Sequence, residues 1–356
     1  MEQLHVHDTI TGDRLFQVHP AEGRWSSRIS GRDDASWAFR LHDKRLRMDR
    51  TFARSLFQPN ARMLVLTDST HVKSATVITD RTYTDSDGVV VTNGGGIKLF
   101  AQQRMTFGVA NYADGDLPIV NRSYSGAVRA ILQRMMQWGG IWPLPIDLPA
   151  DGAGSYSRNI RRWNSSLIAD LLAAIEAEGQ EIYLRPYLAG TQLRYQTLVG
   201  PAVTTGSVLD LPVSVPKSHV ANLVVVEDGS EQLTGAFAIG EGNEADTKTA
   251  FAWAMAGEFS PVRDAAIQKK QTKDVATLSR VATAELTDRR NTIKEWSFDV
   301  VTEGIPVGST APGARLNLDV RDHVWIDDGK YSHRVVGARG EFGSKVESLE
   351  VLAYGS

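Results

Sequence analysis

The sequence of 356 residues contains no cysteine, and this absence excludes several chemistries at once. Disulfide bonds, zinc knuckles, thiolate metal sites and cysteine nucleophiles all require a thiol group. Long hydrophobic runs are absent as well, because none approaches the ~18 residues that a membrane-spanning helix needs. Residues 1–13 lack the basic segment and hydrophobic stretch of a secretory signal. We therefore expect no membrane partner, and the composition leaves open a protein made in the cytoplasm that later works outside a cell.

Common nucleotide-binding and catalytic motifs are missing too. There is no G-x-x-x-x-G-K-[ST] and no G-x-G-x-x-G, and the glycines at positions 94–96 lack the spacing that cradles a phosphate before a helix. Neither the G-x-S-x-G motif of hydrolases nor the H-E-x-x-H motif of zinc proteases occurs. We therefore expect no catalytic residue, no cofactor and no metal, and predict that the protein is not an enzyme. A pair of carboxylates for glycoside hydrolysis need not be close in sequence, so a hydrolase is not excluded.

Two histidines near the start are spaced as in some metal sites. His5 and His7 alternate along an expected strand, so both imidazoles point to the same face. A third ligand, for example Asp8 or His19, cannot be assigned from the sequence. A polar strand face explains the same pattern, and metal binding at His5 and His7 therefore stays open.

The net charge is -3, but the charges are unevenly distributed. Residues 201–356 hold 16 basic and 22 acidic side chains, whereas residues 28–54 hold eight Lys or Arg against four Asp. A basic stretch of this kind is typical of a surface that faces nucleic acid. The interleaved aspartates also fit a solvated face in which the charges pair with one another.

Short alternating segments predict that the first part of the chain is mostly β. Residues 82–84 and 89–92 flank Asp-Ser-Asp-Gly at 85–88, which is typical of a hairpin. These two aspartates do not form an EF-hand, because its further ligand positions hold Tyr83 and Gly94. Several short strands at regular spacing favour a barrel or a sandwich. Residues 43–57 fit this pattern less well and are expected to form a short helix or a long loop.

Helical periodicity appears in the middle of the chain and again near its end. Apolar residues three or four apart predict helices over residues 123–138, 159–178 and 265–290. A proline-rich loop at 141–149 separates the first two helices. A further hairpin is expected around Asp228-Gly229, between residues 220–227 and 232–239, and the last β unit is expected to end at residue 353.

These patterns predict a mainly β protein of the α+β class with an α/β insertion. The expected divisions are a β-barrel over residues 1–115, an α/β insertion over 116–195, a β segment over 196–262 that completes or links the barrels, and a helix followed by a second β-barrel over 263–356.

Short sequence blocks in a fixed order carry a resemblance to a known family. HDTITGDRL at residues 7–15 precedes VHP at 18–20 and GRWS at 23–26, and EIYLRP at 181–186 precedes LVGP at 198–201. Further blocks follow at residues 282–290 and in the closing segment from 313 to 351. Together they span nearly the whole chain and resemble the minor tail proteins of actinobacterial phages. That group is similar to the baseplate hub of contractile-tailed phages and to the tail-associated hub proteins of siphophages.

The resemblance implies a structural role in the virion. Such hubs are homotrimers of tube-like β-barrels at the tail tip, and they join the tail tube or distal tail protein to the central fibre or spike. It also implies a DNA path lined by the protein, with transient and non-specific DNA contacts. Many members carry a further hydrolase or receptor-binding extension; here residue 356 follows the last expected strand, so no lytic role is expected. The alternatives are a cell-wall-degrading enzyme and a host glycan-binding module.

The proline-rich loop supplies the candidate interface residues. Trp142, Leu144 and Ile146 are apolar residues in a segment that contains no ligand motif. Burial at a boundary between chains is one interpretation of them. Packing of the loop onto its own α/β domain is the other interpretation.

Overall fold

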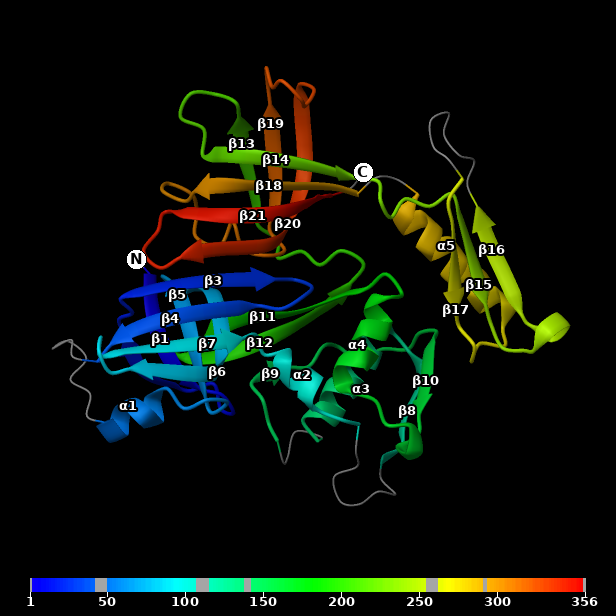
Figure 1. Ribbon diagram of the computed structural model, residues 1–356, viewed down its shortest axis with the longest axis horizontal. Helices are drawn as coiled ribbons and strands as arrows, with labels where there is room; N and C mark the ends of the chain where they lie inside the picture. Colours follow the sequence, from blue (N-terminus) through cyan, green and yellow to red (C-terminus); the bar gives the residue numbers. More distant parts are fainter. Residues whose placement is uncertain are drawn as a thin grey trace. The chain divides into compact units, whose positions relative to one another are not determined.

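The computed structural model describes residues 2–41, 50–106, 115–137, 142–253, 262–290 and 293–354. The chain divides into two compact units, Met1–Leu223 with Ser297–Ser356, and Val224–Trp296 (Figure 1). The fold is mostly β with few helices, which agrees with the predicted α+β class. No helix within the described ranges is both long and apolar enough to cross a membrane.

One large sheet organises the chain. Its strands follow the order β14-β18-β21-β20-β3-β4-β7-β6-β5-β1-β2, while β19 pairs with β20 and with β13. The N-terminal strands of this sheet are β1 (Glu2–Asp8), β2 (Arg14–Val18), β3 (Glu22–Arg28), β4 (Asp34–Arg40), β5 (Arg62–Asp68), β6 (His71–Thr84) and β7 (Val89–Gly95). Its later strands are β13 (Val208–Val213), β14 (Val220–Asp228), β18 (Ile293–Val301), β19 (Arg315–Val320), β20 (Gly329–Glu341) and β21 (Val346–Ala353).

Two long strands change partner along their length. The first half of β6 pairs with β5 and its second half pairs with β7, with a bulge between Ile78 and Asp80. The first half of β20 pairs with β19, and its second half, from Gly337, pairs with β3. Bulges bend a strand and increase its twist. Each of the two long strands can therefore pair with different neighbours along its length, and the sheet continues from the N-terminal to the C-terminal strands. No closed barrel is found among the described strands, so the two tube-like barrels remain a prediction.

The expected hairpin at residues 85–88 is confirmed, since Thr84 pairs with Val89 at the ends of β6 and β7. The segment 43–57 contains the short helix α1 (Arg50–Leu56), while residues 42–49 lie outside the described part. Helix α2 (Leu99–Gln103) follows β7.

The α/β part of the larger unit contains helices α3 (Tyr124–Met135) and α4 (Ile168–Glu176). Ser123 caps α3, and its hydroxyl accepts a hydrogen bond from the Gly126 N–H at 3.0 Å. Two small sheets accompany the helices, one of β8 (Leu117–Arg122) and β10 (Tyr156–Ile160), and one of β9 (Ile146–Asp147), β11 (Glu181–Ala189) and β12 (Gln192–Gly200). Residues 162–164 form a 3-10 turn.

The predicted helix over residues 123–138 is confirmed as α3, whereas the helix predicted over 159–178 begins later. Residues 156–160 pair with β8 as a strand, so α4 starts only at Ile168. Four apolar side chains of α4 are buried in the core shared with α3 and β11: Ile168, Leu171, Leu172 and Ile175. The helical spacing of apolar residues continues through the turn before α4. It therefore does not show where the pairing of β10 with β8 ends.

The smaller unit is a three-stranded sheet with one helix. Strands β16 (Thr249–Trp253) and β17 (Asp264–Gln268) flank β15 (Gly235–Ile239), and helix α5 (Val275–Arg289) covers one face of this sheet. The expected hairpin around Asp228-Gly229 is wrong, because β14 belongs to the large sheet and β15 pairs with β16 and β17. The helix predicted over 265–290 is shorter, because its first residues form β17. Asp274 caps α5 by accepting hydrogen bonds from the N–H groups of Ala276 and Thr277.

Candidate functional site

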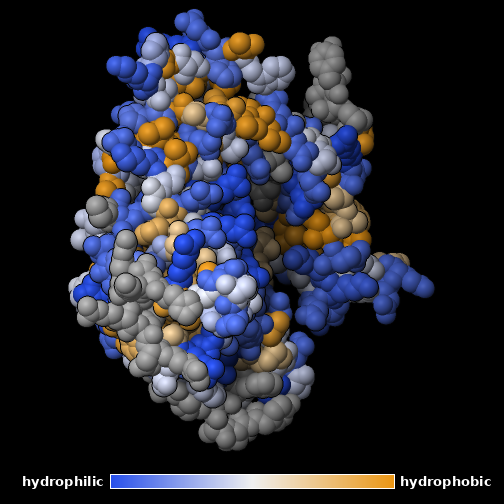
Figure 2. Space-filling view, turned by 60° about the vertical axis from the view of Figure 1, so that its left-hand side comes forward, coloured by the Kyte–Doolittle hydropathy of each residue, from blue (hydrophilic) through white to orange (hydrophobic). Residues whose placement is uncertain are grey.

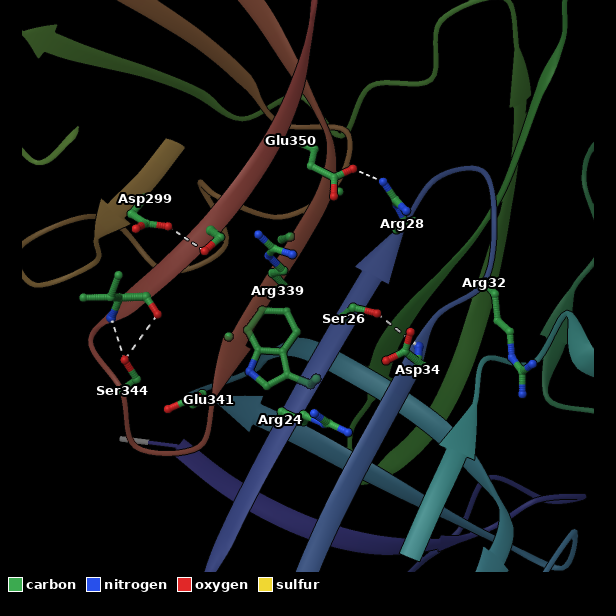
Figure 3. Close-up of a pocket in the computed structure, with 16 residues that line it drawn as sticks. Arg24, Ser26, Arg28, Arg32, Asp34, Asp299, Arg339, Glu341, Ser344 and Glu350 are labelled. Atoms are coloured by element: carbon green, nitrogen blue, oxygen red, sulfur yellow. Dashed lines mark hydrogen bonds and ion pairs between the residues drawn. The ribbon is translucent and has the colours of Figure 1, made fainter. Parts of the chain in front are cut away.

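A polar hollow of about 650 Å³ lies on the face of the large sheet where the N-terminal and C-terminal strands meet. Figure 3 shows its side chains rising from β3, β4, β20 and β21. We call it the charged hollow. Four arginines and four carboxylates line it: Arg24, Arg28, Arg32 and Arg339, and Asp34, Asp299, Glu341 and Glu350.

Strand register brings these residues together in rows. Ser26 pairs with Asp34 on one side and with Arg339 on the other, and Arg339 pairs with Ser348. Directly paired residues share a face of a sheet, so this row crosses four strands. The Ser348 hydroxyl then donates to an Asp299 carboxylate oxygen at 2.6 Å. A second row pairs Arg24 of β3 with Glu341 of β20.

An ion pair crosses a glycine in a third row. Arg28 of β3 and Glu350 of β21 both pair with Gly337 of the intervening strand, and their side chains join above it. A Cβ atom at position 337 would lie 3.3 Å from both charged groups. Glycine therefore leaves room for a bridge between strands that are not neighbours.

The charges of the hollow are balanced rather than of one sign. The pKa of Asp299 is held below its usual range, chiefly by hydrogen bonds from Ser348 and Asn222, with a further contribution from Arg339. Asp299 is therefore ionised at neutral pH and offsets one of the arginines. Equal numbers of cations and anions make a hydrated surface with little net field.

Part of the basic stretch at residues 28–54 lies in the charged hollow. Arg28 and Arg32 line it, and Arg28 is paired with Glu350. Residues 42–49, which contain several of the basic side chains, lie outside the described part. Residues 337–350 were not predicted from the sequence to belong to this site. The alternation of Arg24, Ser26 and Arg28 was a usable signal for a polar strand face, but the pairing of β3 with β20 was not visible.

The three candidate interface residues lie in different environments. Ile146 is 5% exposed in β9, where it pairs with Tyr195 in the core of the α/β part. Leu144 is partly buried against the same core. Trp142 is 47% exposed, and its ring lies 3.9 Å from the Arg104 guanidinium. The loop thus packs onto its own domain at Ile146 while presenting Trp142 at the surface.

The two N-terminal histidines are buried. His5 is 5% exposed and His7 is 1% exposed, so neither ring lies on a polar strand face. The His7 Nδ1 atom lies 2.9 Å from the Gly12 carbonyl oxygen. The described residues contain no group of three or more His, Cys, Asp or Glu that could hold a metal ion.

The structure of the whole chain is similar to solved tail proteins. It superposes on the tail protein from Neisseria meningitidis MC58 with a TM-score of 0.61 and 10% identity, covering 99% of this chain and 97% of that one. The 43 kDa tail protein of prophage MuSo2 from Shewanella oneidensis gives a TM-score of 0.64 at 9% identity, with coverages of 99% and 98%.

A secretion-system protein is similar too. A component of the Escherichia coli type VI secretion system, itself similar in structure to the T4 bacteriophage tail proteins gp27 and gp5, gives a TM-score of 0.52 at 8% identity. The match covers 99% of this chain and 77% of that one. No protein-family model matches this sequence, and no curated protein matches it. The chain therefore has the fold of phage tail proteins, at an identity that shows the fold alone and not a membership in the actinobacterial group.

Proposed function

We propose that this protein is a structural hub of a phage tail tip or baseplate. In this role a homotrimer joins the tail tube or distal tail protein to the central fibre or spike. The observation that carries the proposal is the likeness to two tail proteins over 99% of this chain and 97% or more of theirs. Such a protein is made in the host cytoplasm and is then built into the virion.

Symmetry supports a trimer. The large sheet contains an N-terminal and a C-terminal set of strands, joined where β3 pairs with β20. If each set forms one tube segment, three chains supply six segments around an axis. A ring of this kind matches a six-fold tail tube on one side and a three-fold spike on the other.

The charged hollow has the properties expected of the lining of a channel through which DNA passes. DNA is attracted to excess positive charge, and every neutralised phosphate strengthens the complex. Because the hollow contains equal numbers of arginines and carboxylates, contacts with DNA are weak and independent of sequence. A DNA path requires such weak contacts, since a tight complex would retard ejection.

The trimer is tested by native mass measurement and by symmetry-resolved imaging of assembled tail tips. We expect three copies of this chain per tip, on the tail axis between tube and fibre. A monomer, a six-fold ring of this chain or a position away from the axis would overturn the proposal.

The DNA path is tested by charge reversal. The protein should bind double-stranded DNA more weakly than 1 μM at physiological salt. The double variant Asp34→Lys and Glu341→Lys should bind measurably more tightly and should slow DNA ejection from assembled particles. The exposed hairpin variant Asp87→Lys is the control and should leave ejection unchanged. Sub-micromolar binding by the unmodified protein, or equal ejection by all variants, would contradict this assignment.

The role is structural and not enzymatic. Two of the similar solved structures are tail proteins, and the sequence contains none of the nucleophile or metal motifs considered above. Purified protein should leave host cell walls intact in a turbidity assay. Clearing that a single Asp, Glu or His substitution abolishes would favour a cell-wall-degrading enzyme instead.

A further inference from the structure

One side of the sheet in the smaller unit presents exposed aromatic residues. Helix α5 covers one side of its sheet, where Leu278, Ala282 and Leu286 pack against small residues of β15. The opposite side presents Phe237, Phe251 and Trp253, which are 40%, 65% and 75% exposed. Surface rings in such number are unusual, because aromatic side chains supply most of their stabilisation when buried. We call this side the aromatic face.

Strand register makes the aromatic face a regular grid. Phe237 pairs with Phe251 on one side and with Ala266 on the other, so two aromatic residues are cross-strand neighbours and the third position is small. The row before it contains Trp253, Gly235 and Asp264, and the row after it contains Thr249, Ile239 and Gln268. The result is an apolar strip with hydrogen-bonding groups along its sides.

Gly235 places a carboxylate on this face. A Cβ atom at position 235 would lie 2.3 Å from the Asp264 Oδ1 atom, so the carboxylate lies over the glycine. Trp253 stands on the other side of Gly235. No side-chain hydrogen bond or ion pair of Asp264 occurs within the described residues, which leaves both carboxylate oxygens available as acceptors.

The apolar and polar groups of the aromatic face together indicate the class of ligand that it binds. Rings of a saccharide present C–H groups on their faces and hydroxyl groups at their rims, and the aromatic face offers a matching apolar strip and polar sides. Interfaces between protein chains are enriched in Met and Arg as well as in aromatic residues, and the three rows of this face contain neither Met nor Arg. Residues 224–296 hold 12 acidic and 9 basic side chains, and this excess of negative charge disfavours nucleic acids and anionic polymers as ligands.

We propose that the aromatic face binds an oligosaccharide of uncharged or amino sugars. The rings of Phe251 and Trp253 stack on sugar faces, Phe237 extends the apolar strip beside Phe251, and Asp264 accepts hydrogen bonds from hydroxyl or amine groups. This activity is additional to the hub role and does not depend on it.

The experiment is a glycan array with the full-length protein, which displays uncharged, amino and anionic oligosaccharides. We expect binding to uncharged or amino sugars and none to the anionic ones. Trp253→Ala and Phe251→Ala should each weaken binding at least tenfold. Asp264→Asn should weaken it several-fold. Trp163→Ala removes a ring that is 68% exposed in the larger unit, and this matched control should bind as the unmodified protein does.

Two results would overturn the proposal. Absence of binding across the array is one, and binding that survives Trp253→Ala and Phe251→Ala is the other. Native mass measurement of the same variants separates this proposal from the hub role. Loss of the trimer together with absence of glycan binding would assign the aromatic face to contact with another copy of this chain.

Discussion

The Lys73 ammonium group on β6 lies 2.7 Å from a carboxylate oxygen of Glu347 on β21, and the two side chains are only 11% and 4% exposed. A second carboxylate, that of Glu2, also lies 2.7 Å from Lys73. The remaining Glu347 oxygen accepts a hydrogen bond from Thr310 at 2.6 Å. This buried network links the first strand of the chain to the last one.

Replacing Lys73 should be strongly destabilising. Burial lowers the pKa of Lys73, but the carboxylates of Glu347 and Glu2 raise it by more. The pKa of Lys73 is therefore above its usual value. Lys73→Met leaves two buried carboxylates without their cation, and the free energy of unfolding should fall by about 3–5 kcal/mol. Urea denaturation measures this loss. Lys345→Met removes an exposed ion pair with Glu303 and should cost far less, and similar losses in both variants would contradict the assignment.

Acid should destabilise the fold through the buried His5 and the partly buried His71. Burial lowers the pKa of His5 and of His71 to about 4, with help from Arg14 and Arg185 respectively. Between pH 6.5 and 4 the unfolded chain therefore binds protons that the folded chain does not, so stability falls as pH falls. Each histidine should contribute up to about 3 kcal/mol of this loss. His71→Gln should flatten the dependence of urea midpoint on pH, and an unchanged slope would show that His71 is not held neutral.

Replacement of Gly12 by alanine should destabilise the fold far more than the same replacement of Gly179, a glycine of similar backbone conformation. Gly12 and Gly179 have φ values of +75° and +79°. A Cβ at Gly12 would lie 2.1 Å from the Leu193 carbonyl oxygen, whereas none of the described atoms lies within 4 Å of one at Gly179. Gly179→Ala should cost about 1 kcal/mol from backbone strain alone. Gly12→Ala should cost about 3 kcal/mol or more, because the turn between β1 and β2 must also move away from β12. Equal urea midpoints for the two variants would contradict this contact.

Substitutions of Trp142 and Ile146 should distinguish an effect on trimer assembly from an effect on the stability of the isolated chain. Trp142→Ala should change the stability of the isolated chain by about 1 kcal/mol, since it removes an exposed ring and one contact with Arg104. If Trp142 is buried between chains, the same variant should weaken trimer formation. Ile146→Ala should cost about 2–5 kcal/mol in the isolated chain, because it opens a cavity in the core. Native mass spectra and urea midpoints of both variants decide this, and an intact Trp142→Ala trimer would exclude the ring from the interface.

The amino-acid sequence determines the local elements whose signals do not depend on distant partners. The hairpin at residues 85–88 follows from Asp and Gly between alternating strands, and α3 follows from its apolar spacing and the Ser123 cap. The mainly β class also follows from such local patterns. The same local signals misplaced the starts of α4 and α5, because residues 159–160 and 265–268 fell within the predicted helices yet pair as strands.

Only the tertiary structure decides which distant strands meet. Arg28 and Glu350 are 322 residues apart, and they form an ion pair because β20 lies between their strands and has glycine at position 337. The aromatic face likewise depends on β17 joining β15 in parallel, while α5 takes the other side of the sheet. Periodicity shows that a strand has two faces, but the partners that cover each face are set by long-range pairing and packing, which no local pattern encodes.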